Sequence, residues 1–247
     1  MKFTIITVCY NAENDIRRTI DSVLTQTYTE FQYIIKDGLS TDSTLKIIQE
    51  MTAQDDRVWV ESSEDGGIYD AMNQAVRRAE GDFVFFLNAG DTFYDCEVLS
   101  KVGRAIDQDS VDILYGDILF EKKEGNWIKK YRNIYRYKWI YLLGDCICHQ
   151  AMFAKKTLFE EKVFDTKYRI CADRDWQLHF LNREKIFRFV GYTIASVPVD
   201  GFSLRNVETF ELEVRDCLIE HYVHKAWIYR SLLKIKRILR PREVTLK

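Results

Sequence analysis

The sequence has few of the residues that interrupt regular structure, and it has no long apolar run. Only 2 of its 247 residues are proline and 11 are glycine, which argues against a fibrous or linker-rich chain. No stretch of about 18 consecutive apolar residues occurs, so we predict no membrane-spanning helix. Hydrophobic residues nevertheless make up 47% of the chain. The composition therefore predicts a folded protein with one large domain or two small ones.

The chain also lacks an excess of charge of one sign. Its 36 Lys and Arg residues against 38 Asp and Glu residues leave a net charge of −2, so no global basic field predicts nucleic-acid binding. The charge is unevenly placed, because residues 225–247 contain eight basic residues and one acidic residue. Residues 1–224 are therefore acidic overall, and the C-terminal segment is basic.

The six cysteines do not form a recognisable metal or disulfide pattern. Cys146 and Cys148 are separated by one residue rather than two, and no second cluster completes a zinc site. Free thiols are typical of a reducing compartment. We therefore expect a cytoplasmic protein.

Short apolar runs alternate with helical patterns through the first hundred residues. We predict strands at residues 3–8, 31–35, 58–61 and 82–87, and helices at 14–24, 41–51 and 69–78. Such alternation is typical of a parallel sheet covered by helices on both faces. Ligands of these sheets bind outside the carboxyl ends of the strands, so the turns that follow the strands are where we expect chemistry.

The second half of the chain is less regular. We predict a hairpin from residues 113–121 and 126–130, a helix at 173–181, an extended segment at 187–199 and a helix at 208–239. Residues 130–141 are aromatic and basic. This pattern fits sugar and phosphate contacts or a membrane interface, and it fits equally well an amphipathic segment packed on the core.

Polar turns follow all four predicted strands of the first half. They read TVCYN at residues 7–11, KDGLSTDS at 36–43, EDGGIYDAMN at 64–73 and NAGD at 88–91. An acid followed by glycine allows close backbone approach to a nucleotide, and a carboxylate at the end of a buried strand can hold a divalent cation on a diphosphate. Each turn alone is a common capping or turn motif. Their joint occurrence at four strand ends is much more specific.

Together these segments resemble glycosyltransferase family 2, whose members have the fold called GT-A. The resemblance covers the first hundred residues closely and continues loosely to about residue 205. It implies an α/β fold with a Rossmann-like, mostly parallel central sheet flanked by helices, and a C-terminal helical extension. The expected division is a GT-A domain at residues 1–205, with a nucleotide-sugar-binding half at 1–100 and an acceptor half at 101–205, and an amphipathic basic helical segment at 206–247.

The resemblance also implies a donor site and a metal. The residues that we predict to bind the nucleotide sugar are Thr7, Tyr10, Asn11, Asp37, Asp65, Asn73, Asn88 and Arg205. Asp91 would hold Mn²⁺ or Mg²⁺ on the diphosphate. Family members often carry two or three acids in this motif, whereas here Asn88 and Gly90 stand in place of two of them. The metal would then have a single carboxylate ligand.

The second half would supply the base and the acceptor site. The family places a catalytic acid in a short motif before a helix, which Asp173 matches best and Asp175 second. The alternative is that Asp173 only caps the helix. His149 and Arg174 are weaker candidates for contacts with the sugar or the acceptor, and a structural role for His149 is an equal alternative.

The sequence thus predicts a metal-dependent, inverting glycosyltransferase. The donor would be a nucleotide-diphospho-sugar, with uridine preferred by analogy, and the acceptor a hydroxyl of a growing surface glycan, free or lipid-linked. The missing metal acids leave open a catalytically silent module that binds sugar nucleotides or glycans. A nucleotidyltransferase is disfavoured because no Gly-rich phosphate loop follows the first strand, and a nicotinamide-linked enzyme because no GxGxxG motif does.

The basic C-terminal segment has its own prediction. Within residues 225–240, Ile228, Leu232, Ile235 and Leu239 fall on one helical face with Lys and Arg around them. This pattern favours peripheral contact with the anionic inner face of the cell membrane. Docking on the domain, or on a second subunit in a homodimer, is the alternative.

Overall fold

The fold is that of a computed structural model, which describes residues 3–106, 111–122, 125–131, 146–183, 185–199 and 206–222. The aromatic and basic stretch at 130–141 lies almost entirely outside these residues, and the segment 225–240 lies wholly outside them. All six cysteines fall within the described residues and are free thiols, as expected.

The first half alternates strands and helices, as predicted. Its strands are β1 (Phe3–Cys9), β2 (Phe31–Asp37), β3 (Val58–Ser62) and β4 (Phe83–Phe86). They pair in parallel in the order β3-β2-β1-β4. The connecting helices are α1 (Ile16–Leu24), α2 (Thr44–Thr52) and α3 (Ile68–Val76). Parallel pairing brings the carboxyl ends of these strands, and the polar turns after them, to one edge of the sheet.

The second half extends the same sheet in mixed directions. Its strands are β5 (Thr92–Phe93), β6 (Ile113–Glu121), β7 (Trp127–Lys129), β8 (Met152–Lys155) and β9 (Phe187–Pro198). The full order is β3-β2-β1-β4-β8-β6-β9-β5, with β7 paired to β6. Strand β8 is antiparallel to β4 and β6, and β6 is parallel to β9. The predicted hairpin is confirmed by the antiparallel pairing of β6 and β7.

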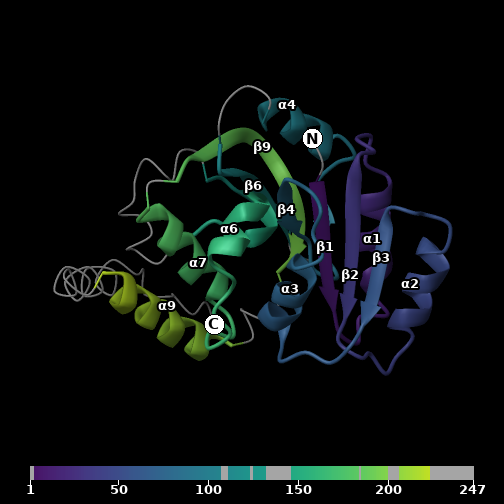
Figure 1. The fold of residues 1–247 in the computed structure, drawn as a ribbon, viewed down its shortest axis with the longest axis horizontal. Helices are drawn as coiled ribbons and strands as arrows, with labels where there is room; N and C mark the ends of the chain where they lie inside the picture. The colour runs from purple at the N-terminus through teal and green to yellow at the C-terminus, as the bar shows by residue number, and fades with distance from the viewer. Residues whose placement is uncertain are drawn as a thin grey trace, which may run out of the picture.

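The helices of the second half are α4 (Val98–Ile106), the short 3₁₀ helix η2 (His149–Ala151), α6 (Lys156–Glu161), α7 (Ala172–Leu181) and α9 (Val207–His221). Of these, α6, α7 and α9 lie on the side of the molecule away from α1 and α2 (Figure 1), whereas α4 covers the same part of the core as α1. The helix predicted at 208–239 is described only as far as α9, which packs beside α7 (Figure 1). Among the described helices, none is both long enough and apolar enough to cross a bilayer.

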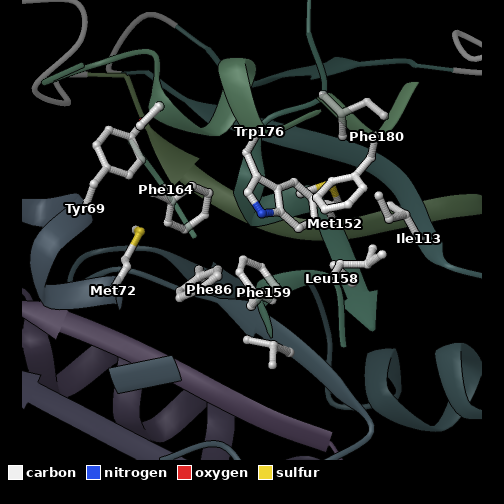
Figure 2. Close-up of a cluster of buried hydrophobic side chains, with 14 of the residues drawn as sticks. Tyr69, Met72, Phe86, Ile113, Met152, Leu158, Phe159, Phe164, Trp176 and Phe180 are labelled. Atoms are coloured by element: carbon white, nitrogen blue, oxygen red, sulfur yellow. The ribbon is translucent and has the colours of Figure 1, made fainter. Parts of the chain in front are cut away.

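The core has two parts because successive strand residues face opposite sides of the sheet. Ile5 of β1 belongs to the part under α1 and α4, whereas its neighbour Ile6 belongs to the part under α3, α6 and α7. Figure 2 shows the second part, where Trp176 of α7 stacks on Phe159 with ring centroids 4.7 Å apart. Phe164 packs against both rings of this pair and against Phe86 of β4. These rings fix α7 against the sheet.

Truncation of Trp176 to alanine should destabilise the protein by about 3–5 kcal/mol, the usual cost of removing a buried aromatic side chain. Trp176 is fully buried, and its Nε1 also donates to the Lys162 carbonyl at 2.6 Å. Urea unfolding followed by circular dichroism measures the loss. Trp127→Ala is the matched control, because Trp127 is 43% exposed and its removal should cost under about 1 kcal/mol. Equal losses in the two variants would contradict the packing described.

Candidate active site

The turn after β2 is built around the carboxylate of Asp37, which ends the strand. One oxygen accepts the hydroxyl of Ser40, and the other accepts the Ser62 hydroxyl at 2.6 Å and the Ser40 backbone N–H at 3.1 Å. Asp37 is fully buried, so these bonds satisfy a group whose burial would otherwise be costly. Asp37 fixes the turn, and its direct contact with a nucleobase stays a prediction.

Lys36 joins the turn after β2 to the turn after β3. Its side chain is 1% exposed, and Nζ donates to the carbonyls of Ser63 at 2.5 Å and Asp37 at 3.1 Å. Nζ also lies 3.5 Å from Asp65 Oδ2. That oxygen covers Gly38, where an added Cβ would lie only 2.7 Å from it. Asp65 is therefore held at the strand-end edge, directly over the Asp37-Gly38 turn.

The loop after β1 forms the exposed rim beside these turns. Asn11 has φ = +49°, a left-handed conformation that asparagine tolerates. Its N–H donates to Ser40 Oγ at 2.8 Å, and its Oδ1 accepts the Thr41 N–H at 2.9 Å. Tyr10 is 64% exposed at this rim. Thr7 lies below it, fully buried, and donates its hydroxyl to the carbonyl that follows β4 at 2.7 Å.

Asp91 lies buried in the loop after β4. Burial raises the pKa of its carboxyl to about 6, although a hydrogen bond from Gln150 Nε2 to Oδ2, at 3.0 Å, and the charge of Arg18 act in the opposite direction. A divalent cation would relieve this desolvated carboxylate. In the same loop, the buried Oδ1 of Asn88 has no hydrogen-bond partner among the described residues. The Asp91 carboxylate and Asn88 Oδ1 are oxygen ligands of the kind that a hard cation such as Mg²⁺ or Mn²⁺ prefers.

The residues around Asp91 do not form a complete metal cage. Within the part of the chain that the structure describes, no group of three or more His, Cys, Asp or Glu side chains could hold a metal ion. A cation at Asp91 would therefore need further ligands from a bound diphosphate and water. Mg²⁺ is commonly bound in this way, by one or two carboxylates together with substrate phosphates.

Asp173 lies in the first turn of α7 with three donors around its carboxylate. Oδ1 accepts the Arg174 N–H at 2.8 Å and the Tyr69 hydroxyl at 3.2 Å, and Oδ2 lies 3.3 Å from His149 Nδ1. The Tyr69 hydroxyl has a single proton, which it shares with the closer Ile170 carbonyl at 2.7 Å. Asp173 is 8% exposed. Its carboxylate is thus oriented by side chains from α3 and η2 as well as by its own helix.

The adjacent residues His149 and Gln150 connect the two carboxylates. Asn88 Nδ2 lies 3.0 Å from His149 Nε2, and Gln150 binds Asp91 as described above. In this orientation of the Asn88 amide, Nε2 accepts, so the ring proton lies on Nδ1 and faces Asp173. The two residues of η2 therefore hold Asp91 and Asp173 at one site, although the two carboxylates come from opposite halves of the chain.

The structure does not bring every sequence-predicted residue to this site. The Asn73 amide makes both its bonds to the backbone of Phe164, at 2.8 and 3.0 Å. Arg174 is buried in α7, with only 1% of its surface exposed. Arg205 lies outside the described residues. Asp175, the second candidate for the base, is 2% exposed, and its carboxylate is paired with His221 and Lys162.

Three residues of the site were not singled out by sequence reasoning, namely Lys36, Tyr69 and Gln150. Lys36 did carry a signal, because a lysine at the end of an apolar strand must find buried partners. Tyr69 lies within the motif at residues 64–73, but neither its role nor that of Gln150 is predictable from the sequence, because their partners Asp173 and Asp91 are 104 and 59 residues away.

Comparisons with known proteins identify the family and the fold. The sequence profile described as glycosyl transferase family 2 matches residues 4–189. A "PGL/p-HBAD biosynthesis glycosyltransferase" of Mycobacterium bovis is 31% identical over 198 residues, which cover 78% of this chain and 75% of that protein. The crystal structure of residues 1–349 of Staphylococcus aureus TarS in complex with UDP is similar with a TM-score of 0.73 and 20% identity, over 94% of this chain and 70% of that one.

A more distant structural relative is the mannosyltransferase PcManGT of Pyrobaculum calidifontis in complex with GDP-Man and Mn²⁺. Its TM-score is 0.65 at 17% identity, over 97% of this chain and 76% of that one. These structural likenesses confirm the predicted α/β fold of the GT-A type. The profile match spans most of the sequence and includes β1 to β4, η2 and α7. The chain therefore belongs to glycosyltransferase family 2.

Proposed function

We propose that the chain transfers a sugar from a nucleotide-diphospho-sugar to an acceptor hydroxyl with inversion at the anomeric carbon. The observation that carries this proposal is the link made by His149 and Gln150 between Asp173 and Asp91. A base and a site for the leaving diphosphate must lie on either side of one anomeric carbon in a single displacement. Two carboxylates oriented by adjacent residues suit that requirement.

The donor is proposed to bind at the strand-end edge. The exposed ring of Tyr10 and the rim at Asn11 and Asp65 would face the nucleoside, with the Asp37 turn behind them. A uridine nucleotide is supported by TarS, whose solved structures contain UDP and UDP-GlcNAc. A guanosine nucleotide is the alternative, because PcManGT was solved with GDP-Man.

The divalent cation is proposed to bind at Asp91 together with Asn88 Oδ1. When bound, the cation would neutralise charge that develops on the leaving diphosphate. Gln150 would keep the Asp91 carboxylate in place through its hydrogen bond to Oδ2. Mn²⁺ is supported by PcManGT and by a glucosyl-3-phosphoglycerate synthase of Mycobacterium tuberculosis, both solved with Mn²⁺.

Asp173 is proposed as the general base. Oδ2 would accept the proton of the acceptor hydroxyl as that oxygen attacks the anomeric carbon from the face opposite the diphosphate. Tyr69 and the Arg174 N–H bind the other oxygen, which leaves Oδ2 oriented toward His149 and the site. The proton on His149 Nδ1 would hold this carboxylate in place.

The acceptor is proposed to be a hydroxyl of a growing surface glycan. Relatives named for PGL/p-HBAD biosynthesis and for transfer of N-acetylglucosamine to poly(ribitol-phosphate) support an envelope glycan as the class of acceptor. A lipid-linked acceptor, peripheral membrane contact through 225–240, the division at residue 205 and a homodimer stay predictions. A catalytically silent binding module is the competing proposal, favoured by the single carboxylate at the metal position.

Calorimetric titration of the full chain tests the proposal. The panel comprises UDP-glucose, UDP-galactose, UDP-GlcNAc, GDP-mannose and a dTDP-sugar, each with Mn²⁺ and with EDTA. Tight binding of one member that requires Mn²⁺, followed by turnover to a product of inverted configuration, would support the transferase. Binding without turnover on any acceptor would favour the silent module, and a product of retained configuration would overturn the displacement mechanism.

Replacement of Gly38 by alanine should weaken donor binding by about tenfold, or about 1.4 kcal/mol. The new methyl group would lie 2.7 Å from Asp65 Oδ2, so the Asp65 side chain must leave the strand-end edge. Calorimetry with the donor chosen above measures the loss. Gly103→Ala is the control, because its Cβ would meet no atom closer than 3.8 Å. Wild-type affinity in Gly38→Ala would show that Asp65 does not contribute to the donor site.

A further inference from the structure

The carboxylate of Glu213, in the middle of α9, binds the segment that leads into α7. Oε1 accepts the Arg169 N–H at 2.8 Å, and Oε2 accepts the N–H groups of Ile170 and Cys171 at 2.8 and 2.9 Å. Three consecutive backbone donors therefore converge on one side chain. Backbone N–H groups in such an arrangement, next to the N-terminus of a helix, favour an anion.

A second contact fixes α7 to α9 on the other side of Asp173. Asp175 accepts hydrogen bonds from His221 Nε2 at 2.7 Å and pairs with Lys162 Nζ at 2.8 Å. Burial alone would raise the pKa of Asp175, but these two partners outweigh it and lower the pKa below its usual value. Helix α9 thus holds the residues before Asp173 through Glu213 and a residue after it through His221.

The segment that Glu213 binds also carries contacts of the proposed base. The Tyr69 hydroxyl shares its single proton between the Ile170 carbonyl at 2.7 Å and Asp173 Oδ1 at 3.2 Å. The Cys171 carbonyl accepts the Asp175 N–H at 3.0 Å, which starts the hydrogen bonding of α7. A shift of residues 169–171 would therefore move both the start of the helix and the tyrosine that orients the base.

We propose that Glu213 is a positioning residue for the transfer reaction, which makes α9 part of the catalytic unit. The inference rests on the proposed function of Asp173 as base. Glu213 lies beyond residues 4–189, the part of the chain that matches the family profile. Glu213 touches neither Asp173 nor the donor edge among its hydrogen bonds, so it acts through the backbone of residues 169–171.

Glu213→Gln tests this with little change in shape. An amide has one acceptor oxygen and an NH₂ donor, so at least one of the three N–H groups would face another donor. The matched control is Glu220→Gln on the same helix. Glu220 forms an exposed ion pair with Lys167 at 2.8 Å and binds no backbone N–H of the segment.

The experiment uses the full chain, Mn²⁺ and the panel member that the wild type binds most tightly, and its readout is nucleotide release on hydrolysis of the donor, in which water takes the sugar in place of the acceptor hydroxyl. Asp173→Asn sets the rate without a base. We expect Glu213→Gln to lower kcat at least about tenfold, since small misplacements of a reacting group have large effects on rate, with the donor Kd within about twofold of wild type. Deuterium exchange should rise in peptides that contain residues 169–171. Glu220→Gln should change none of these.

Two results would overturn the inference about Glu213 and leave the proposed function intact. One is a wild-type kcat in Glu213→Gln while Asp173→Asn is inactive. The other is an equal loss of kcat and donor affinity, which would mean that Glu213 maintains the fold and not the position of the base. Failure of the proposed function looks different: the wild type binds no panel member, or Asp173→Asn releases nucleotide at the wild-type rate. In that case the inference falls with it.

Discussion

Asp173→Asn should lower turnover by about 10²–10⁴-fold, the usual contribution of a general base, with donor affinity close to that of the wild type. The amide cannot take the proton of the acceptor hydroxyl. It keeps the shape of the side chain and an oxygen that can accept from Tyr69 or the Arg174 N–H. The donor edge at β1 to β3 contains no contact with Asp173, so binding should be preserved.

The same substitution separates catalysis from helix capping. The N-cap of α7 is Cys171, so Asp173 could stabilise the helix only through its charge in the first turn; if that were its whole role, Asp173→Asn would cost about 0.3–1 kcal/mol of stability and leave turnover unchanged. Initial rates and calorimetric Kd values are measured side by side. Asp216→Asn, an exposed residue of α9 paired with Arg215, serves as control and should keep the wild-type rate. Full turnover in Asp173→Asn would remove Asp173 from its proposed role.

The elements that sequence reasoning found are those with local signals. In the first half, each strand and helix has a hydrophobic periodicity that can be read from its own residues. In α1, for example, Ile16, Ile20 and Val23 form the buried face. Strand β8 was not predicted, because four residues carry too little periodicity. Its place between β4 and β6 is decided by antiparallel pairing with residues about 40 to 70 positions away.

The site shows the same limit at the level of side chains. A motif predicts which residues lie near a strand end, but it does not predict where each side chain points. Thr7 and Asn73 stand within motifs, yet both satisfy their polar groups inside the protein. Gln150 and Glu213, by contrast, become part of the site only because folding brings distant segments together.

Removal of the Asp91 carboxylate should have the second large effect on activity. If the cation rests on this single carboxylate, Asp91→Asn should abolish the Mn²⁺ dependence of donor binding and lower turnover by about 10²-fold or more, because metal stabilisation of a leaving group contributes several kcal/mol. Calorimetry with Mn²⁺ and with EDTA measures the first effect, and initial rates the second. Asp95→Asn is the control, since the Asp95 carboxylate pairs with Lys101 on α4. A donor affinity that falls on EDTA treatment of Asp91→Asn would show that the metal binds elsewhere.

In the metal-free protein, the Asp91 carboxylate should make the free energy of unfolding depend on pH. Burial raises the pKa of Asp91 from 3.8 in its ordinary state to about 6 in the folded protein, so the native state holds this proton more tightly than the unfolded chain. The contribution of Asp91 to the free energy of unfolding is therefore present below pH 4 and is lost as the pH rises to about 6, by about 3 kcal/mol at most. Asp91→Asn cannot ionise and should lack this decline, so in EDTA above pH 6 it should unfold at a higher urea concentration than the wild type. Mn²⁺ with the donor should reverse that order, because only the wild-type carboxylate gains a cation. A metal site with one acidic ligand requires a buried carboxylate that destabilises the metal-free protein and stabilises the protein with Mn²⁺ and donor bound.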